Sequence, residues 1–262
     1  MTLTMAQWAI LALTAFMHGF NKTGILGSAI ITTPLLLMVF SAGETLGIVL
    51  PLLVFADILT LVLLGKSARW PYVIRALPWA ILGIGVGWLL AREAVRMGAA
   101  GDFLLRKTIA VILVGVVIAS FYQRWRKIRR EKALAETAAG ATDAPPRAWF
   151  AAGMGILGGV TTMLANNGGP AWVAYLMSVK LAPKEFLGTA AWLFFIQNLV
   201  KIPFAVSLGF INADTLAGNV YLMPFVVVGV LSGGIAVKRL SQPFFVVLTQ
   251  VMALVGALYL LA

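Results

Sequence analysis

The stretch MLANNGGPAW, residues 163–172, places two asparagines, two glycines and a proline in the middle of an apolar run. No charged residue occurs between residues 148 and 179. A continuous helix over that run would be about 48 Å long, which exceeds the roughly 30 Å hydrocarbon core of a membrane. Asparagine, glycine and proline favour turns over helix. The run therefore predicts a broken or re-entrant membrane segment rather than one straight helix.

The composition around this stretch is that of an integral membrane protein. Of 262 residues, 61% are hydrophobic and 11% are charged, whereas roughly a quarter of the residues in a soluble domain are charged. Runs of about 20 apolar residues predict an all-α polytopic protein with about eight membrane segments. The predicted segments lie near 5–40, 45–64, 71–91, 103–123, 148–179, 186–208, 216–237 and 243–262.

The first predicted segment is also too long for one helix and carries a polar interruption, HGFNKTGILGS (18–28). Segments 1 and 5 are therefore both predicted to be broken or re-entrant. The N-terminal residues lack the basic start and the small-residue cleavage site of a signal peptide. We expect the mature chain to begin at or near Met1.

The two interruptions belong to an internal repeat. Gly19 and Gly159 are 140 residues apart, as are Phe55 and Phe195, and the spacing of Pro78, Gly83 and Gly87 recurs at Pro224, Gly229 and Gly233. Between the copies, the segment from Arg124 to Arg147 holds seven Lys or Arg and three Asp or Glu residues. The sequence therefore predicts a membrane repeat at 1–123, a basic loop at 124–147 and a second membrane repeat at 148–262.

A duplicated chain with a broken helix at the matching place in each copy is typical of secondary transporters, whose sites lie between the halves near the membrane midplane. Unwound backbone in a bilayer needs hydrogen-bond partners, and the N–H groups that begin a half-helix favour an anion. We predict an anion site with Asn166, Asn167, Gly168 and Gly169 on one side. The alternative is that the two glycines only permit close helix packing.

Ionisable side chains at membrane depth are few, and they face protein or water rather than lipid. Lys22 lies inside the first interruption between Asn21 and Thr23, and these three residues are predicted to face the anion from the other side. In the sixth segment, Gln197, Asn198 and Lys201 are further predicted ligands; the alternative for Lys201 is extension to the membrane surface.

Asp57 occupies the repeat position of Gln197. A buried carboxylate is either paired or protonated, so Asp57 is predicted to pair with Lys22 or Lys201, or to carry a coupled proton. His18 is the second candidate for proton coupling, and the alternative for it is a hydrogen-bonded residue packed between helices.

The residue inventory limits the other classes of function. With no cysteine and one histidine, the chain offers no disulfide, thiolate metal site or bis-histidine haem site, and we expect neither a cofactor nor a metal. No nucleophile and base recur near the surface, which argues against an enzyme. The basic loop, with seven Lys or Arg against three Asp or Glu, supplies +4 of the net charge of +11. Such a loop is ordinary beside anionic lipid and does not indicate a nucleic-acid partner.

The chain resembles the TauE/SafE sulfite exporter family, also called the toluene-sulfonate uptake permease family. The resemblance rests on the repeat and on PKEFLGTAAWLFFIQN (183–198). That family typically has Gly-x-Gly-Gly-Gly and then Pro-Leu-Leu in each copy, and Gly-Thr-Ser near the next helix. Here the second copy reads Asn167-Gly168-Gly169-Pro170 and Gly188-Thr189-Ala190, and the first keeps Gly27-Ser28-Ala29 and Pro34-Leu35-Leu36, which is typical of a divergent member.

The resemblance implies a transporter of sulfite, organosulfonates or related small oxyanions in the cell's inner (plasma) membrane. The expected partners are a small anionic substrate, the lipid bilayer and, if transport is coupled, protons. A channel with the same lining and a carrier of carboxylates or other small anions remain alternatives. The sequence also leaves open the direction of transport, whether the repeats are parallel or inverted, and whether the protein is a homodimer.

Overall fold

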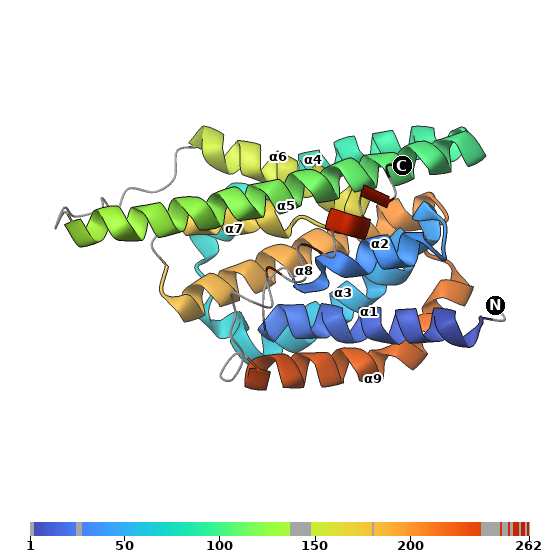
Figure 1. Ribbon diagram of the computed structural model, residues 1–262, viewed down its shortest axis with the longest axis horizontal. Helices are drawn as coiled ribbons and strands as arrows, with labels where there is room; N and C mark the ends of the chain where they lie inside the picture. The colour runs from blue at the N-terminus through green and yellow to red at the C-terminus, as the bar shows by residue number, and fades with distance from the viewer. Residues whose placement is uncertain are drawn as a thin grey trace.

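The computed structural model describes residues 3–24, 28–136, 148–179 and 181–236, together with positions 247, 251, 254–256, 258–259 and 261. This part of the chain is helical and contains no strand, so the predicted all-α class is confirmed (Figure 1). Its helices are α1 (Met5–Thr23), η1 (Ser28–Ile31), α2 (Thr32–Leu37), α3 (Ala42–Leu64), η2 (Gly65–Ser67), α4 (Trp70–Arg96), α5 (Ala99–Glu136), α6 (Ala148–Ala165), α7 (Gly169–Met177), α8 (Pro183–Ser207) and α9 (Ala213–Ala236).

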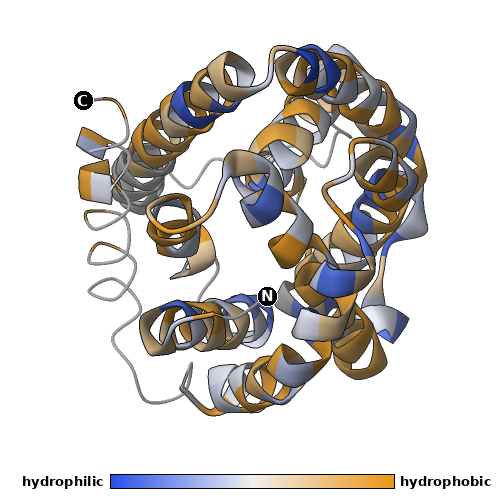
Figure 2. Cartoon of the chain, turned by 90° about the vertical axis from the view of Figure 1, so that its right-hand side faces the viewer, coloured by the Kyte–Doolittle hydropathy of each residue, from blue (hydrophilic) through white to orange (hydrophobic). Residues whose placement is uncertain are grey.

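Five helices of the described residues are long and apolar enough to cross a membrane. These candidate spans are Ala42–Ser67, Trp70–Arg96, Ala148–Ala165, Lys184–Ser207 and Ala213–Ile235. Hydrophobic residues run along most of the helical ribbon (Figure 2). The chain is therefore a multi-pass membrane protein. The count of eight segments stays a prediction, and the segment predicted at 243–262 lies mostly outside the described residues.

Local sequence explains where several helices begin. At α1, the Gln7 amide N–H donates to Thr4 Oγ1 over 3.3 Å, and the Gln7 side chain accepts from the Thr4 amide over 2.9 Å. Ser41 and Glu44 form the same reciprocal cap at α3. Pro183 starts α8, where a missing N–H costs nothing. These caps set the first residues of α1, α3 and α8, three helices that carry polar residues described below.

Helix α5 continues beyond the boundary that the sequence predicted for it. The first repeat was predicted to end at residue 123 and to be followed by a loop, but α5 runs without a break to Glu136. Lys, Arg, Glu and Ala dominate residues 124–136 and are good helix formers, so the helix propagates into the basic segment. The rest of the predicted loop, 137–147, lies outside the described residues.

Two helix pairs cross at backbone contact. A β-carbon on Gly19 of α1 would lie 2.2 Å from the carbonyl oxygen of Val226 in α9. A β-carbon on Gly159 of α6 would lie at the same distance from the carbonyl oxygen of Ala80 in α4. Only glycine permits so close an approach, which is how helices associate in lipid. Helix α1 therefore packs closely against α9, and α6 packs closely against α4.

Replacing Gly159 with alanine is expected to lower the free energy of unfolding by about 1–3 kcal/mol, because the new methyl group forces α4 and α6 apart. Gly153→Ala in the same helix is the matched control, since a β-carbon there meets nothing within 4 Å. The measurement is the melting temperature of both variants in detergent. Equal melting temperatures would contradict the close crossing.

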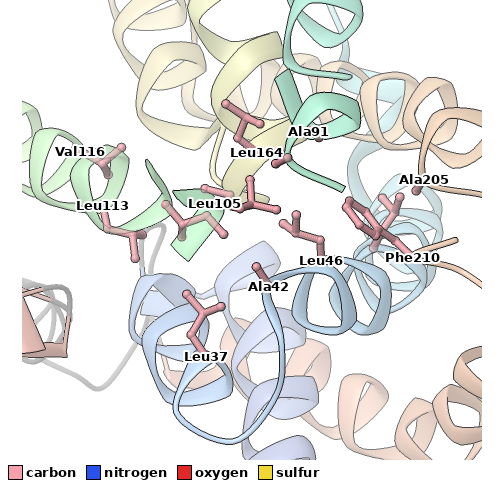
Figure 3. Packing of buried hydrophobic residues seen from close by; sticks show 14 of the residues in the cluster. Leu37, Ala42, Leu46, Ala91, Leu105, Leu113, Val116, Leu164, Ala205 and Phe210 are labelled. Atoms are coloured by element: carbon pink, nitrogen blue, oxygen red, sulfur yellow. The ribbon is translucent and has the colours of Figure 1, made fainter. Parts of the chain in front are cut away.

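The interior between the two halves is an apolar cluster to which α2, α3, α4, α5, α6 and α8 contribute (Figure 3). Leu46 of α3 and Leu164 of α6 both belong to it. Helices α3 and α8 run antiparallel beside it, because Trp192 near the start of α8 donates to the Gly65 carbonyl at the end of α3. Further along, Asn198 meets Asp57 in the middle of α3. This antiparallel pair carries most of the polar residues described next.

Candidate functional site

An ion pair joins the end of α1 to the middle of α3. Lys22 Nζ lies 2.5 Å from Asp57 Oδ1, and both side chains are buried. The sequence left Lys22 and Lys201 as alternative partners for Asp57, and the structure places Lys22 there. Asp57 Oδ2 accepts a hydrogen bond of 2.7 Å from Asn198 Nδ2 of α8, so the carboxylate connects three helices.

The charge of Lys22 is largely compensated by these contacts. Besides Asp57, its ammonium lies 4.5 Å from the ring centroid of Phe194, where a cation–π attraction adds to the ion pair. A buried cation that already has a carboxylate partner gains less from a second anion than an unpaired one does. Lys22 is therefore a weaker candidate ligand for an anion than the sequence predicted.

One face of α8 supplies the next part of the site. Phe194, Gln197, Asn198 and Lys201 are spaced at i, i+3, i+4 and i+7, so their side chains leave the helix on one side. Gln197 and Lys201 are 1% and 2% exposed. The buried position of Lys201 excludes the alternative in which its ammonium extends to the membrane surface.

Lys201 is held by neutral oxygens alone among the described residues. Its Nζ donates to Thr162 Oγ1 over 3.1 Å and to Asn166 Oδ1 over 2.6 Å, both at the end of α6. No carboxylate of this part of the chain lies within ion-pair distance of it. Lys201 is thus a buried lysine whose ammonium touches no carboxylate of the described residues, and one of its three N–H donors stays open.

Asn166 ends α6 and fixes the position of Lys201. Its φ of 51° lies in the left-handed region, which asparagine tolerates better than most residues. Its Oδ1 accepts from Lys201, and its Nδ2 donates over 3.2 Å to the carbonyl oxygen of Leu46 in α3. The oxygen of this amide and one of its two N–H groups are engaged, so Asn166 holds Lys201 in place; its role as a direct ligand stays a prediction.

The chain between α6 and α7 presents donors. The Nδ2 of Asn167 is buried and has no acceptor among the described residues. A β-carbon on Gly168 would lie 2.8 Å from the carbonyl oxygen of Gly158 and 3.0 Å from Gln197 Nε2. Gly168 therefore brings the backbone close to the Gln197 amide. Gly169 and Pro170 begin α7.

The predicted residues of the first interruption do not all face this site. Thr23 Oγ1 donates over 2.5 Å to the carbonyl oxygen of Val230 in α9, so its hydroxyl serves the contact between α1 and α9. His18 Nε2 lies 3.2 Å from Thr32 Oγ1, whose hydroxyl in turn donates to the Ala29 carbonyl. Asn21 is half-buried in the last turn of α1. Gly27 lies outside the described residues.

Three side chains that contact the predicted ligands were missed by the sequence reasoning. Thr162 binds Lys201, Phe194 lies under Lys22, and Trp172 Nε1 donates over 2.7 Å to Gln197 Oε1. The spacing of Phe194 from Asn198, one helical turn, was a usable signal for Phe194. Among the described residues, no three His, Asp or Glu side chains gather as a metal site would require.

Comparison with known proteins places the chain in a family. The family model described as Sulfite exporter TauE/SafE matches residues 11–260. No curated protein and no solved structure matches the chain. The match covers nearly all of the 262 residues, so the chain belongs to the TauE/SafE sulfite exporter family, a family of membrane transporters for small sulfur-containing anions.

Proposed function

We propose that the protein is a secondary transporter that carries a small oxyanion, of the sulfite or organosulfonate type, bound near the membrane midplane beside the break between α6 and α7. The observation that carries the proposal is Lys201, a buried cation that only neutral oxygens contact. The amide groups of Gln197 and Asn167, with hydrogen atoms to donate, lie at the same break.

The electrostatic cost of Lys201 supports an anionic guest. Removing an ammonium group from water costs several kcal/mol, and a protein usually repays that cost with a carboxylate. Here the carboxylate of Asp57 pairs with Lys22 instead. An anion at the break would supply the missing counter-charge and accept from the open donors. Asn198 lies on the same face of α8 as Lys201 and would border the anion together with Lys22, through their shared contacts with Asp57.

The packing supports inverted repeats. By the repeat spacing, α3 corresponds to α8, and these two helices run antiparallel. The crossing at Gly19 and Val226 corresponds to the crossing at Gly159 and Ala80, because Val226 follows Ala80 by the same 146 residues that separate Pro224 from Pro78. Inverted halves that meet at a central site are the usual basis of alternating access. We propose this mechanism here, with four segments in each half.

A proton on Asp57 is the proposed coupling device. The carboxylate holds Lys22 of α1 and Asn198 of α8, so protonation would remove the ion pair and free the end of α1 from α3. His18 is less suited to this role, since its ring contacts Thr32 and not the Asp57 network. The protein would act as a multi-pass carrier of the inner (plasma) membrane.

The test is a binding and transport panel. Purified protein is titrated with sulfite, sulfate, methanesulfonate, acetate and methylphosphonate, and uptake of the bound anions into proteoliposomes is then measured. We expect the sulfur oxyanions to bind best and to be taken up with saturation. Preference for acetate, or no binding of any anion, would contradict the proposal.

The two glycines of the break give a matched pair for the same assay. Gly168→Ala is expected to weaken oxyanion binding at least about tenfold, because its methyl group would meet the Gly158 carbonyl and displace the Gln197 amide. Gly169→Ala should bind as the original protein does, since a β-carbon there meets only Phe194, at 3.9 Å. Equal loss in both variants would show that the break tolerates no added methyl group at either glycine, and would contradict the special role of Gly168.

A further inference from the structure

Trp172 and Gln197 form a buried pair of fixed polarity. The indole N–H can only donate, and it donates to Gln197 Oε1 over 2.7 Å. If the Gln197 amide were flipped, its NH2 group would face the indole N–H, and two donors would meet. The indole therefore requires that the amide oxygen of Gln197 points toward it. The Gln197 NH2 group must then point the other way, and it lies 3.0 Å from the position of a Gly168 β-carbon.

Trp172 is itself held in place. It is 0% exposed, and its backbone N–H donates over 3.3 Å to the carbonyl oxygen of Gly168. Its ring stands edge-on to Tyr175, with 6.3 Å between the ring centroids, within an apolar cluster of α4, α6, α7 and α8. The indole therefore cannot turn to follow the amide, and the amide must follow the indole.

In the described part of the chain, the hydrogen bond that the Gln197 side chain makes uses its oxygen, which accepts from the indole. Its NH2 group has no acceptor there. The open N–H of Lys201, one turn further along α8, is likewise a donor. At this point the break presents hydrogen atoms to a ligand and offers no oxygen from Gln197.

We propose, building on the proposed oxyanion transport, that Trp172 is a positioning residue that makes Gln197 an obligatory donor and so selects oxyanions whose oxygens carry no proton. A sulfonate presents bare oxygens in every orientation. A phosphonate monoanion has the same shape and charge, but one of its oxygens carries a hydrogen. The break presents three donors, from Lys201, Asn167 and Gln197, but only two oxygens of the phosphonate are bare. In every orientation its O–H therefore meets a donor, unless the Gln197 amide turns its oxygen toward it.

The probes are methanesulfonate and methylphosphonate, measured by titration calorimetry at a pH where methylphosphonate is a monoanion. The unmodified protein is expected to bind methanesulfonate about tenfold more tightly or better, the value of one lost hydrogen bond to a charged group. In Trp172→Phe the amide can turn its oxygen toward the ligand, so the preference should fall to about twofold or less. Tyr175→Phe, in the same helix and cluster, is the control and should keep the preference.

A second variant tests the inference if Trp172→Phe does not fold. Gln197→Met removes the amide, so it should lose the preference for methanesulfonate over methylphosphonate while it still binds both anions through Lys201. Equal affinities for the two probes in the unmodified protein, or an unchanged preference in Trp172→Phe or Gln197→Met, would overturn this inference and leave oxyanion transport standing. If no oxyanion binds to the unmodified protein, the proposed function fails, and this inference fails with it.

Discussion

Lys201→Met is expected to abolish oxyanion binding while leaving a folded protein. The variant keeps the length of the side chain and removes an ammonium group that has no carboxylate of the described residues within ion-pair distance. Truncating one partner of a buried charged pair typically costs about 2–5 kcal/mol, which is roughly thirtyfold or more in Kd. The measurement is the affinity for sulfite and methanesulfonate by titration calorimetry, with the melting temperature as the check on folding.

Two control variants accompany Lys201→Met: one removes another lysine of α8, and one keeps the positive charge at position 201. Lys184→Met removes an exposed lysine near the start of α8 and should change nothing. Lys201→Arg should rescue poorly, because a forked guanidinium does not fit the two acceptors, Thr162 and Asn166, that hold the ammonium. Unchanged affinity in Lys201→Met would remove Lys201 from the site, and with it the main support for an anionic substrate.

The sequence predicted where the helices would break but not which lysine would remain unpaired. The ends of α6 and α7 follow from residue types that disfavour helix, and this is local information. The partner of Asp57 depends on how α1, α3 and α8 pack, which no spacing along the chain specifies. The sequence left both Lys22 and Lys201 open as the partner of Asp57, and a distance in the structure decides between them: Lys22 Nζ lies 2.5 Å from the carboxylate.

The residues between α6 and α7 have different roles in the structure, and these roles also depend on packing that the sequence does not specify. In the sequence, Asn166 and Asn167 are equal candidates as donors, and Gly168 and Gly169 are equally small. In the structure the Asn166 amide is engaged by Lys201 and Leu46, and only Gly168 is crowded. Trp172 reads as one more apolar residue of a membrane segment, although its single polar atom orients Gln197. Such roles depend on neighbours far away in the chain.

Asp57→Asn is expected to lower the free energy of unfolding by about 3–5 kcal/mol, because it leaves the Lys22 ammonium buried without a counter-charge. The hydrogen bond from Asn198 Nδ2 is kept in the variant, because the oxygen of an asparagine can still accept it. The expected loss of stability therefore comes from the ion pair. The double variant Lys22→Met, Asp57→Asn removes both charges and should recover most of the lost stability. The measurement is the melting temperature of the single and double variants in one detergent.

The double variant also separates the two roles of Asp57, because it restores stability without restoring a carboxylate. An asparagine cannot take up or release a proton, so the stable double variant should still bind oxyanions at Lys201 but lose the response of transport to a proton gradient. Proteoliposome uptake with and without an imposed pH difference measures this response. Proton-driven uptake at the original rate in the double variant would show that Asp57 holds α1 against α3 and α8 and carries no coupled proton. Recovered stability together with lost coupling would assign both roles to the one carboxylate, since Lys22 and Asn198 bind it from different helices.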